Sequence, residues 1–525
     1  MKMVKKFSIL MVVLLVLLAG CSSGTTSKTT KKTASDEQTG GVLKIALNAQ
    51  PPTLDTHLTT QTVALEVTRN IYETLVTQNA KQQPVPMLAE SIDKSDDGLI
   101  YTFHLRKGVK FHNGKEMKAE DVTASMNRWL KLSSRAKLLL SGANFESKDD
   151  YTVELKLQSV ASDVLDIMAG RGQFPAIMPK EIIESAGKDG VTEYIGTGPF
   201  EYVEWKQDQY IRLKRFDDYA AVDEEPSGIA GRKTAYVDEV YYYIVTDPST
   251  RMAGVQTGQY DIATYMPYDN YEQLKSDKNL KTYVSFDGGT LNVSYNKKHG
   301  LFTNQKIRDA VNTALDLNAI MLASFGHKDL FKLSPGYMST EQVDWATGAG
   351  KESYNLADPN TAKTKLKEAG YKGEEITLYS TRDYDYMYNS AVVMKEELEQ
   401  IGMKVKLEIF DWPTLIEIRE NPDNWDIMVV GTGYVTTPSQ LLVVNPDYVG
   451  WTNDQKITDL LAKIRTSASQ EEAKGLWEEL QTYMWDDYLP FTLFGHYSTI
   501  MTTSNKLEGF TPFQGAIPWN VKKKQ

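Results

Sequence analysis

The stretch from Pro86 to Trp129 constrains the fold more than any other part of the sequence, because it combines a strand, two turns and a helix. Leu99 to Leu105 alternates apolar and polar residues, which is the pattern of a half-buried strand. Asp96 to Gly98 forms a turn signal before this strand, and His112 to Gly114 forms another after it. The residues from Lys118 onward predict an amphipathic helix. The chain therefore contains a strand, turn and helix within one supersecondary unit.

Length and charge narrow the class of protein. A chain of 525 residues is too long for a single core, so we expect at least two domains and as many as three. The formal net charge of −11 argues against a nucleic-acid partner, which requires clustered Lys and Arg. The chain has 29 Tyr and 9 Trp, whose rings can pack in a hydrophobic core or line a solvated ligand cleft.

The N-terminus predicts export and lipidation. Three lysines precede the apolar run Phe7 to Leu18, which is too short for a typical spanning helix and indicates a signal peptide over residues 1–20. Leu18 to Cys21 is similar to a lipobox, so we expect a diacylglycerol on Cys21; the alternative is an ordinary secretory signal with a chance cysteine. Residues 21–41 are rich in Ser, Thr, Lys and Gly, and they predict a flexible tether.

No sequence pattern predicts an enzyme, a metal site or a cofactor. Cys21 is the only cysteine, which excludes intrachain disulfides and all-cysteine zinc sites. The six histidines are scattered without a His-Glu-x-x-His motif, and a Gly-x-Ser-x-Gly elbow is absent. Gly348 to Lys351 does not fit a phosphate loop, since Glu352 follows the lysine. We therefore do not expect an enzyme.

Several motifs in order along the chain resemble the extracellular solute-binding proteins of the peptide and nickel family, the receptors of ABC importers. The resemblance begins near Gly41 and extends to the last strand. It rests on the Pro86 to Trp129 block, including Leu88 to Ser91 as a helix end, on a Gly-Thr-Gly-Pro-Phe turn, and on several later segments. The main segments are 68–76, 196–200, 209–213, 240–244, 292–296, 306–316, 354–371 and 378–409.

The resemblance implies an α/β fold of the type II periplasmic-binding-protein kind, with two main lobes, a hinge and an extra inserted lobe. By analogy, residues 77–197 form the inserted lobe II and residues 291–494 form lobe III. Lobe I is discontinuous and consists of residues 42–76, 198–290 and 495–525. The resemblance also implies a helix over Thr68 to Val76, and chain crossings between lobes near Asn292 to Asn296 and Leu489 to Phe494.

Two clamps for a peptide-like ligand follow from the same resemblance. Arg382 resembles the arginine that takes the substrate carboxylate in dipeptide-binding members; the alternative is a surface ion pair with Asp383 or Asp385. Dipeptide-binding members also carry an aspartate for the ligand's α-amino group, and Tyr434 stands in its place here. The predicted ligand contacts in this turn and elsewhere are Gly433, Tyr434, Thr436, Thr437, Asp411, Trp412, Tyr295, Leu54 and Asp55. For Trp412, the alternative to a ligand contact is a place in the hydrophobic core.

The sequence thus predicts a lipid-anchored receptor on the extracytoplasmic face of a cell membrane, of the Gram-positive type and monomeric. It would capture an oligopeptide or peptide-like solute by hinge closure and deliver it to an ABC permease. Two alternatives stay open. The same fold could bind a non-peptide solute such as a chelated metal, a sugar or an opine-like compound, or it could serve as a signalling or adhesion lipoprotein that docks a protein partner.

Overall fold

The computed structural model describes residues 40–467 and 469–524. The predicted signal peptide, the predicted lipidation residue Cys21 and nearly all of the predicted tether lie outside these residues. In the described ranges, no helix combines the length and the apolar composition that crossing a membrane requires.

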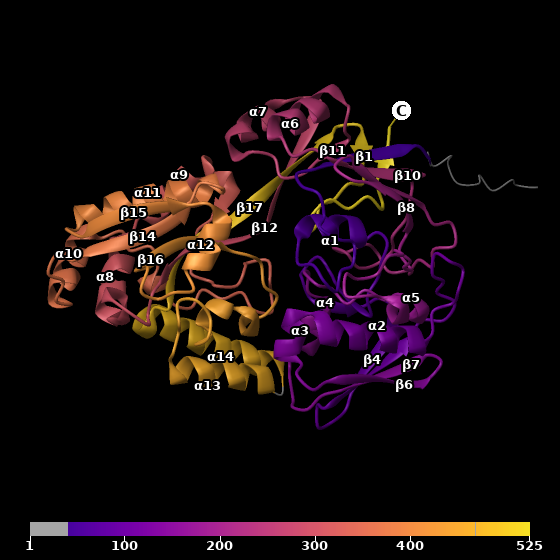
Figure 1. Ribbon diagram of the computed structural model, residues 1–525, viewed down its shortest axis with the longest axis horizontal. Helices are drawn as coiled ribbons and strands as arrows, with labels where there is room; N and C mark the ends of the chain where they lie inside the picture. The colour runs from indigo at the N-terminus through magenta and orange to yellow at the C-terminus, as the bar shows by residue number, and fades with distance from the viewer. Residues whose placement is uncertain (1–39, 468, 525) are drawn as a thin grey trace, which may run out of the picture. The chain divides into compact units, whose positions relative to one another are not determined.

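Within the described residues, a mixed sheet of eleven strands forms the framework (Figure 1). Parallel pairs with intervening helices, such as β14 with β15 through α11, give the sheet its α/β character. In order, the strands are β15 (Lys404–Phe410), β14 (Glu375–Thr381), β16 (Ile427–Thr432), β12 (Leu280–Tyr295), β17 (Phe491–Ser504), β11 (Ile262–Ala263), β1 (Val42–Leu47), β10 (Glu239–Ile244), β9 (Tyr210–Arg215) and β8 (Phe200–Lys206), with β13 (Phe331–Lys332) paired beside β17.

The two long central strands, β12 and β17, connect the halves of this sheet (Figure 1). Their antiparallel pairing runs from Leu280 opposite Ser504 to Ser294 opposite Phe491. The register shifts between Ser285 and Gly289, which leaves a bulge in β12. The motifs near residues 292–296 and 489–494 mark only one end of this ladder.

A separate four-stranded antiparallel sheet contains the two strands of the Pro86 to Trp129 stretch, β4 and β5. Its order is β4 (Ala89–Lys94), β5 (Ile100–Leu105), β7 (Thr152–Lys156) and β6 (Asn144–Asp149). Tyr101, Phe103 and Leu105 are buried in alternation along β5, as the period-two pattern predicted. The short strands β2 (Val76–Gln78) and β3 (Pro84–Pro86) form a further pair, as do β18 (Leu507–Glu508) and β19 (Lys522–Lys523).

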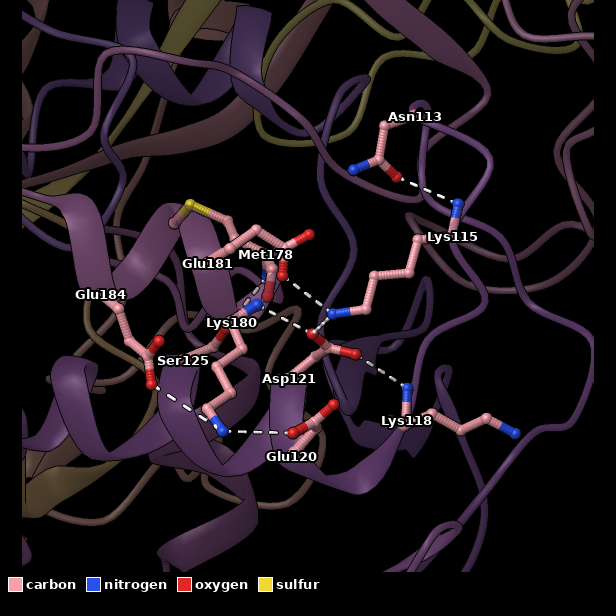
Figure 2. A network of polar contacts seen from close by, with 10 residues as sticks. All are labelled: Asn113, Lys115, Lys118, Glu120, Asp121, Ser125, Met178, Lys180, Glu181 and Glu184. Atoms are coloured by element: carbon pink, nitrogen blue, oxygen red, sulfur yellow. Dashed lines mark hydrogen bonds and ion pairs between the residues drawn. The ribbon is translucent and has the colours of Figure 1, made fainter.

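Helix α2 (Ala119–Leu132) covers this small sheet, and a buried carboxylate fixes its N-terminus (Figure 2). Asp121 accepts hydrogen bonds from the backbone amides of Lys118 at 3.0 Å and Lys180 at 2.8 Å, and it pairs with Lys115 Nζ at 2.6 Å. One turn later, Ser125 Oγ donates to the carbonyl of Met178 at 3.1 Å. Asp121 and Ser125 therefore have a structural role, because they join α2 to the 178–180 segment.

The remaining α-helices lie on the two faces and at the ends of these sheets. They are α1 (Thr62–Thr68), α3 (Ser134–Leu139), α4 (Val164–Ala169), α5 (Lys180–Ser185), α6 (Pro248–Thr257), α7 (Tyr271–Ser276), α8 (Gln305–Ala314), α9 (Leu317–Phe325), α10 (Pro359–Glu368), α11 (Asp385–Gln400), α12 (Trp412–Ile418), α13 (Gln455–Thr466) and α14 (Gln470–Tyr483).

Two secondary-structure predictions are wrong. The structure has no helix over Thr68 to Val76 as predicted: α1 covers Thr62–Thr68 and ends at Thr68. It ends there because Arg69 Nε and Asn70 Nδ2 donate to the carbonyls of the preceding turn, which replaces further helical hydrogen bonds. The segment Leu88 to Ser91, predicted as a helix end, instead enters strand β4, since its backbone pairs with β5.

Buried apolar side chains in the described residues form several clusters rather than one core. The largest surrounds β12, β17 and helices α8 to α11. A second lies between the small sheet and α2, and a third surrounds β1, β9 and β10. A small fourth cluster includes Leu415 of α12 and Trp425.

Candidate ligand-binding site

A charged pair at the β12 bulge is the centre of the candidate site. Asp287 lies in the bulge, and its carboxylate accepts a hydrogen bond of 2.8 Å from Thr499 Oγ1 of β17. Arg171 follows α4, and its Nη1 lies 3.9 Å from Asp287 Oδ2. The same guanidinium donates through Nη2 to the backbone carbonyl of Asp287. Both side chains are nearly buried, so their interaction is only weakly screened by water.

Tyr434 joins this pair from the loop after β16. The Arg171 guanidinium carbon lies 5.0 Å from the centroid of the Tyr434 ring, in a cation–π contact. The Tyr434 hydroxyl donates to Gln82 Oε1. Burial raises the pKa of Tyr434, and the Arg171 charge opposes this shift. Tyr434 is therefore a neutral hydrogen-bond donor that contacts two distant segments of the chain.

A second buried acid lies near the same charges. Glu66 of α1 is fully buried, and its pKa rises to about 8 because of that burial; the Arg69 charge opposes the shift and the Asp287 charge adds to it. Tyr265 is also influenced by Glu66 and Asp287, and burial raises its pKa. Acidic, basic and phenolic groups thus meet where α1, β12 and the segment after α4 approach one another.

A row of aromatic rings leads from these charges to the surface. Tyr386 lies 5.1 Å from Tyr497 of β17, measured between ring centroids, and 5.9 Å from Tyr384. Tyr384, which is 40% exposed, contacts the Trp412 ring edge-on at 5.3 Å. Such rings offer apolar faces and polar hydroxyls to a solute.

A pocket lies beside the loop that contains Gly433 and Tyr434. Its wall includes Phe286 and Thr290 of β12, Gln342 and His496. Gln342 Nε2 donates to the backbone carbonyls of Val435 at 2.8 Å and Thr436 at 3.2 Å, which holds the loop against the pocket. This concave surface is formed by segments from β12, β16, β17 and the loop before residue 342.

Of the predicted residues of the 433–437 loop, Gly433 and Tyr434 line this pocket, whereas Thr436 and Thr437 do not. Gly433 is exposed, whereas Thr436 and Thr437 are buried. Thr436 Oγ1 donates to the Asp166 carbonyl of α4 at 3.4 Å, and Thr437 Oγ1 lies 2.8 Å from Ser439 Oγ. The loop therefore contacts α4 through the Thr436 hydroxyl.

Arg382, Asp411 and Trp412 form a second group near Tyr384. Arg382 is exposed, its Nη2 donates to Tyr388 Oη at 2.9 Å, and it forms no ion pair within the described residues. Asp411 caps α12 by accepting from the Thr414 amide at 3.0 Å. The Trp412 amide donates to Asp383 Oδ2 at 2.7 Å. These residues border the outer end of the aromatic row.

Three predicted contacts have internal partners instead. Tyr295 is fully buried, with its hydroxyl 2.7 Å from Thr492 Oγ1. Asp55 is buried and accepts from Arg128 Nη1 at 3.0 Å, and Leu54 belongs to the core around β1. Their side chains support the fold next to the site.

Arg171, Asp287, Glu66 and Tyr265 were not predicted from the sequence. Asp287 precedes Gly288 and Gly289 inside a strand pattern, and glycine inside a strand is a signal for a bulge. The position of Arg171 between two glycines marks only a loop. Within the described residues, no three His, Cys, Asp or Glu side chains are grouped so as to hold a metal ion.

Comparison with known proteins identifies the family of this chain. The sequence profile described as bacterial extracellular solute-binding proteins, family 5 Middle, matches residues 83–453. The chain is 31% identical over 473 residues to the probable peptide ABC transporter periplasmic-binding protein y4tO of Sinorhizobium fredii, covering 86% of this chain and 88% of that protein. It is 28% identical over 555 aligned positions to the oligopeptide-binding protein AppA of Bacillus subtilis, covering 98% and 97% of the two chains.

Solved structures agree with the sequence comparison. AppA in complex with a nonapeptide superposes with a TM-score of 0.71 at 26% identity, covering 91% of this chain and 97% of AppA. AgaA from A. tumefaciens R10, in complex with agropinic acid, has a TM-score of 0.74 at 26% identity, covering 92% and 99%. The predicted α/β fold of the type II periplasmic-binding-protein kind is confirmed. The profile match and the relationship to y4tO show that this chain belongs to family 5 of the bacterial extracellular solute-binding proteins.

Proposed function

We propose that this protein is the solute-binding receptor of an ABC importer and that it captures an oligopeptide or peptide-like solute. The main support is the meeting of Arg171, Asp287 and Tyr434, which come from three segments that are far apart in the sequence. A site with paired charges beside aromatic rings suits a ligand that carries both charged and apolar groups. The related proteins y4tO and AppA, named for peptide transport and oligopeptide binding, support the same ligand class.

Capture by hinge closure is part of the proposal. The two crossing strands β12 and β17 would act as the hinge, with the bulge at Asp287 as its flexible point. The lobes would be residues 42–76, 198–290 and 495–525 for lobe I, 77–197 for lobe II and 291–494 for lobe III. Contacts of Tyr434 with Gln82 and of Thr436 with Asp166 join the 433–437 loop to the proposed lobe II.

The proposed ligand contacts fall into two groups. Gly433, Tyr434, Thr436 and Thr437 would face the inner part of the solute, next to Arg171 and Asp287. Arg382, Asp411 and Trp412 would contact its outer end, with Arg382 as a partner for a carboxylate. Leu54, Asp55 and Tyr295 would support these groups, since their side chains already have internal partners.

Membrane attachment would come from a lipid on Cys21, with residues 21–41 as the tether. This arrangement would hold the monomeric receptor at the extracytoplasmic face of the cell membrane, close to its ABC permease. The lipobox-like segment Leu18 to Cys21 supports this part of the proposal. Mass spectrometry of the membrane fraction tests it: a diacylglyceryl adduct on the peptide beginning at Cys21 is expected.

A non-peptide solute is the second candidate. Tyr434 occupies the position where the resemblance to dipeptide-binding members implies an aspartate, so the usual partner of a peptide amino group is missing there. AgaA, whose structure contains agropinic acid, supports this alternative. An opine-like acid would then use the charged groups of the site without a peptide backbone.

Thermal unfolding with added solutes tests the proposal. Peptides from dipeptides to nonapeptides, opines, sugars and nickel chelates are compared with a no-ligand control. A bound solute at about one hundred times its Kd should stabilise the folded protein by about 2.7 kcal/mol. Stabilisation by peptides supports the first candidate, and stabilisation by opines alone supports the second. No response from any solute, together with capture of a protein partner, would contradict both.

A further inference from the structure

A small cavity lies next to the charged pair, between α1, the segment after α4 and the C-terminal segment. Its apolar wall includes Leu65, Met87, Phe174 and Trp519. Arg171 lines the cavity and also contacts Asp287, so the cavity adjoins the candidate site. None of the predicted ligand contacts lines it.

Cationic side chains outnumber carboxylates in the cavity wall. Arg69, Arg171 and Lys233 carry positive charge, whereas Glu73 is the sole acidic residue among the lining residues. Glu73 is already neutralised: its Oε1 lies 2.8 Å from Lys233 Nζ, and its Oε2 accepts from Thr197 Oγ1 at 3.1 Å. Arg171 already lies against Asp287, which is not part of the wall. Arg69 is therefore the guanidinium of the wall that has no ion-pair partner among the described residues.

Arg69 has backbone partners only. Its Nε donates to the Leu65 carbonyl at 3.2 Å and its Nη1 to the Phe513 carbonyl at 2.9 Å. It is 8% exposed, and within residues 40–467 and 469–524 it forms no ion pair with a carboxylate. Burial lowers the pKa of Arg69, the Glu66 charge opposes this shift, and the nearby Arg171 charge adds to it. An anion between the two arginines would relieve their repulsion.

Polar atoms in the wall are also unsatisfied. Tyr72 Oη and Gln514 Oε1 have no hydrogen-bond partner among the described residues, although Tyr72 is only 1% exposed and Gln514 only 3%. Buried polar groups without partners are rare and costly in folded proteins. A ligand oxygen could accept from the Tyr72 hydroxyl, and a ligand N–H or O–H could donate to Gln514.

We propose that this cavity receives a carboxylate group of the captured solute, with Arg69 and Arg171 as its two cationic partners and Tyr72 as a hydrogen-bond donor. Planar guanidinium forks match the two oxygens of a carboxylate. The apolar wall would contact the carbon chain next to that group. This inference rests on the proposed capture of a solute, and it makes acidic solutes the preferred class.

Four tripeptides provide matched probes: Ala-Ala-Glu and Ala-Ala-Gln, each with a free C-terminal carboxylate and as the C-terminal amide. Each is titrated calorimetrically into the full-length protein. Replacing the carboxylate that enters the cavity by an amide should weaken binding by about tenfold or more. Arg69→Gln and Arg171→Gln should each remove most of this selectivity, whereas Arg69→Lys and Arg171→Lys should retain part of it because they keep the charge.

Arg232→Gln is the matched control, because Arg232 is a surface residue paired with Glu225 and should keep the full selectivity. Equal binding of acids and amides by the wild type would overturn the proposal. Selectivity that survives both Arg69→Gln and Arg171→Gln but disappears in Arg382→Gln would also overturn it, since Arg382 would then be the carboxylate partner. Thermal unfolding without ligand identifies any glutamine variant that fails to fold. In that case the selectivity of Arg69→Lys and Arg171→Lys for acids over amides tests the proposal.

A second pair of probes distinguishes failure of the proposed peptide capture from failure of the carboxylate cavity. If none of the tripeptides binds the wild type, succinate and its dimethyl ester are titrated into the same proteins. Binding of succinate that is lost in Arg171→Gln supports the carboxylate cavity while the peptide part of the proposed function fails. No binding of either compound overturns the cavity proposal as well.

Discussion

Arg171 and Asp287 are 116 residues apart in the sequence, yet the guanidinium of one donates to the backbone carbonyl of the other and lies 3.9 Å from its carboxylate. This pair joins the segment after α4 to the bulge of a strand that crosses between the halves of the main sheet. The same arginine contacts Tyr434 and lines a cationic cavity. Arg171 therefore connects the groups on which the proposed capture of a solute depends.

Asp287→Asn tests whether the acid of this pair receives a cationic group of the solute. Asparagine keeps an oxygen for the Thr499 hydroxyl but removes the charge. Affinity for solutes with a free amino group should fall by about tenfold or more, because a charged hydrogen bond is lost. Calorimetric titration measures this, with Asp329→Asn as control, since Asp329 is a surface residue paired with Lys275. An equal loss for N-acetylated solutes would contradict a role in binding an amino group.

Tyr434→Asp should change the ligand class. The variant places a carboxylate where the resemblance to dipeptide-binding members expects one, and Arg171 lies close enough to moderate the cost of burying it. We expect dipeptides to stabilise this variant against heat more than they stabilise the wild type. Tyr434→Phe is the control, since it keeps the ring over Arg171 and removes only the bond to Gln82. Wild-type protein that already binds dipeptides as tightly as the variant would contradict the expectation.

Glu66→Gln should alter the dependence of stability on pH. Burial raises the pKa of Glu66 from an ordinary value of 4.5 to about 8. Between these values the folded state holds a proton that the unfolded state has released, so the free energy of unfolding falls as pH rises through this window. Glutamine mimics the protonated acid and removes this part of the decline. Part of the decline remains, because burial also raises the pKa of Asp166 and Glu397 to about 8.

Urea unfolding of wild type and Glu66→Gln at about pH 5 and about pH 8 measures the difference. The variant should be similar to the wild type at the lower pH and more stable, relative to it, at the higher pH. Parallel declines in both proteins would show that Glu66 does not hold a proton in the folded state.

Asp121→Ala should affect stability without affecting the site. Asp121 caps α2 and pairs with Lys115, so its removal should destabilise the surrounding part of the chain by about 2 kcal/mol. Scanning calorimetry should detect a lower unfolding temperature. Solute affinity, measured below that temperature, should be unchanged; a large loss of affinity would indicate that the α2 region contributes directly to the site.

The sequence patterns predicted local elements better than the site. The alternation in β5 and the amphipathic pattern of α2 depend on neighbouring residues, so they are visible in the sequence. The helix predicted over Thr68 to Val76 was misplaced because the side chains of Arg69 and Asn70 bond to carbonyls of the last turn of α1. These bonds are local, but they form only in particular side-chain conformations, which the sequence does not show. The resemblance to a family predicted the fold class correctly, but it did not predict the residues at which individual helices begin and end.

The site itself depends on contacts between distant segments. Tyr434 was predicted because it stands where dipeptide-binding members of the family carry an aspartate. Its partner Arg171 lies in a loop without a recognisable sequence pattern. Asp287 became notable only through the bulge that turns it toward Arg171. Arg382 remains a proposed contact: its exposed position next to Tyr388 leaves it available to a ligand.

Hydrogen–deuterium exchange with and without a saturating solute tests the central claim most directly, because it reports on all three segments at once. The solute is the one that most stabilises the protein in the thermal screen. Binding at the proposed site predicts slower exchange in the segments around Arg171, Asp287 and Tyr434 together, with little change in the small sheet around β5. Slower exchange confined to other segments, with these three unchanged, would contradict the proposed site.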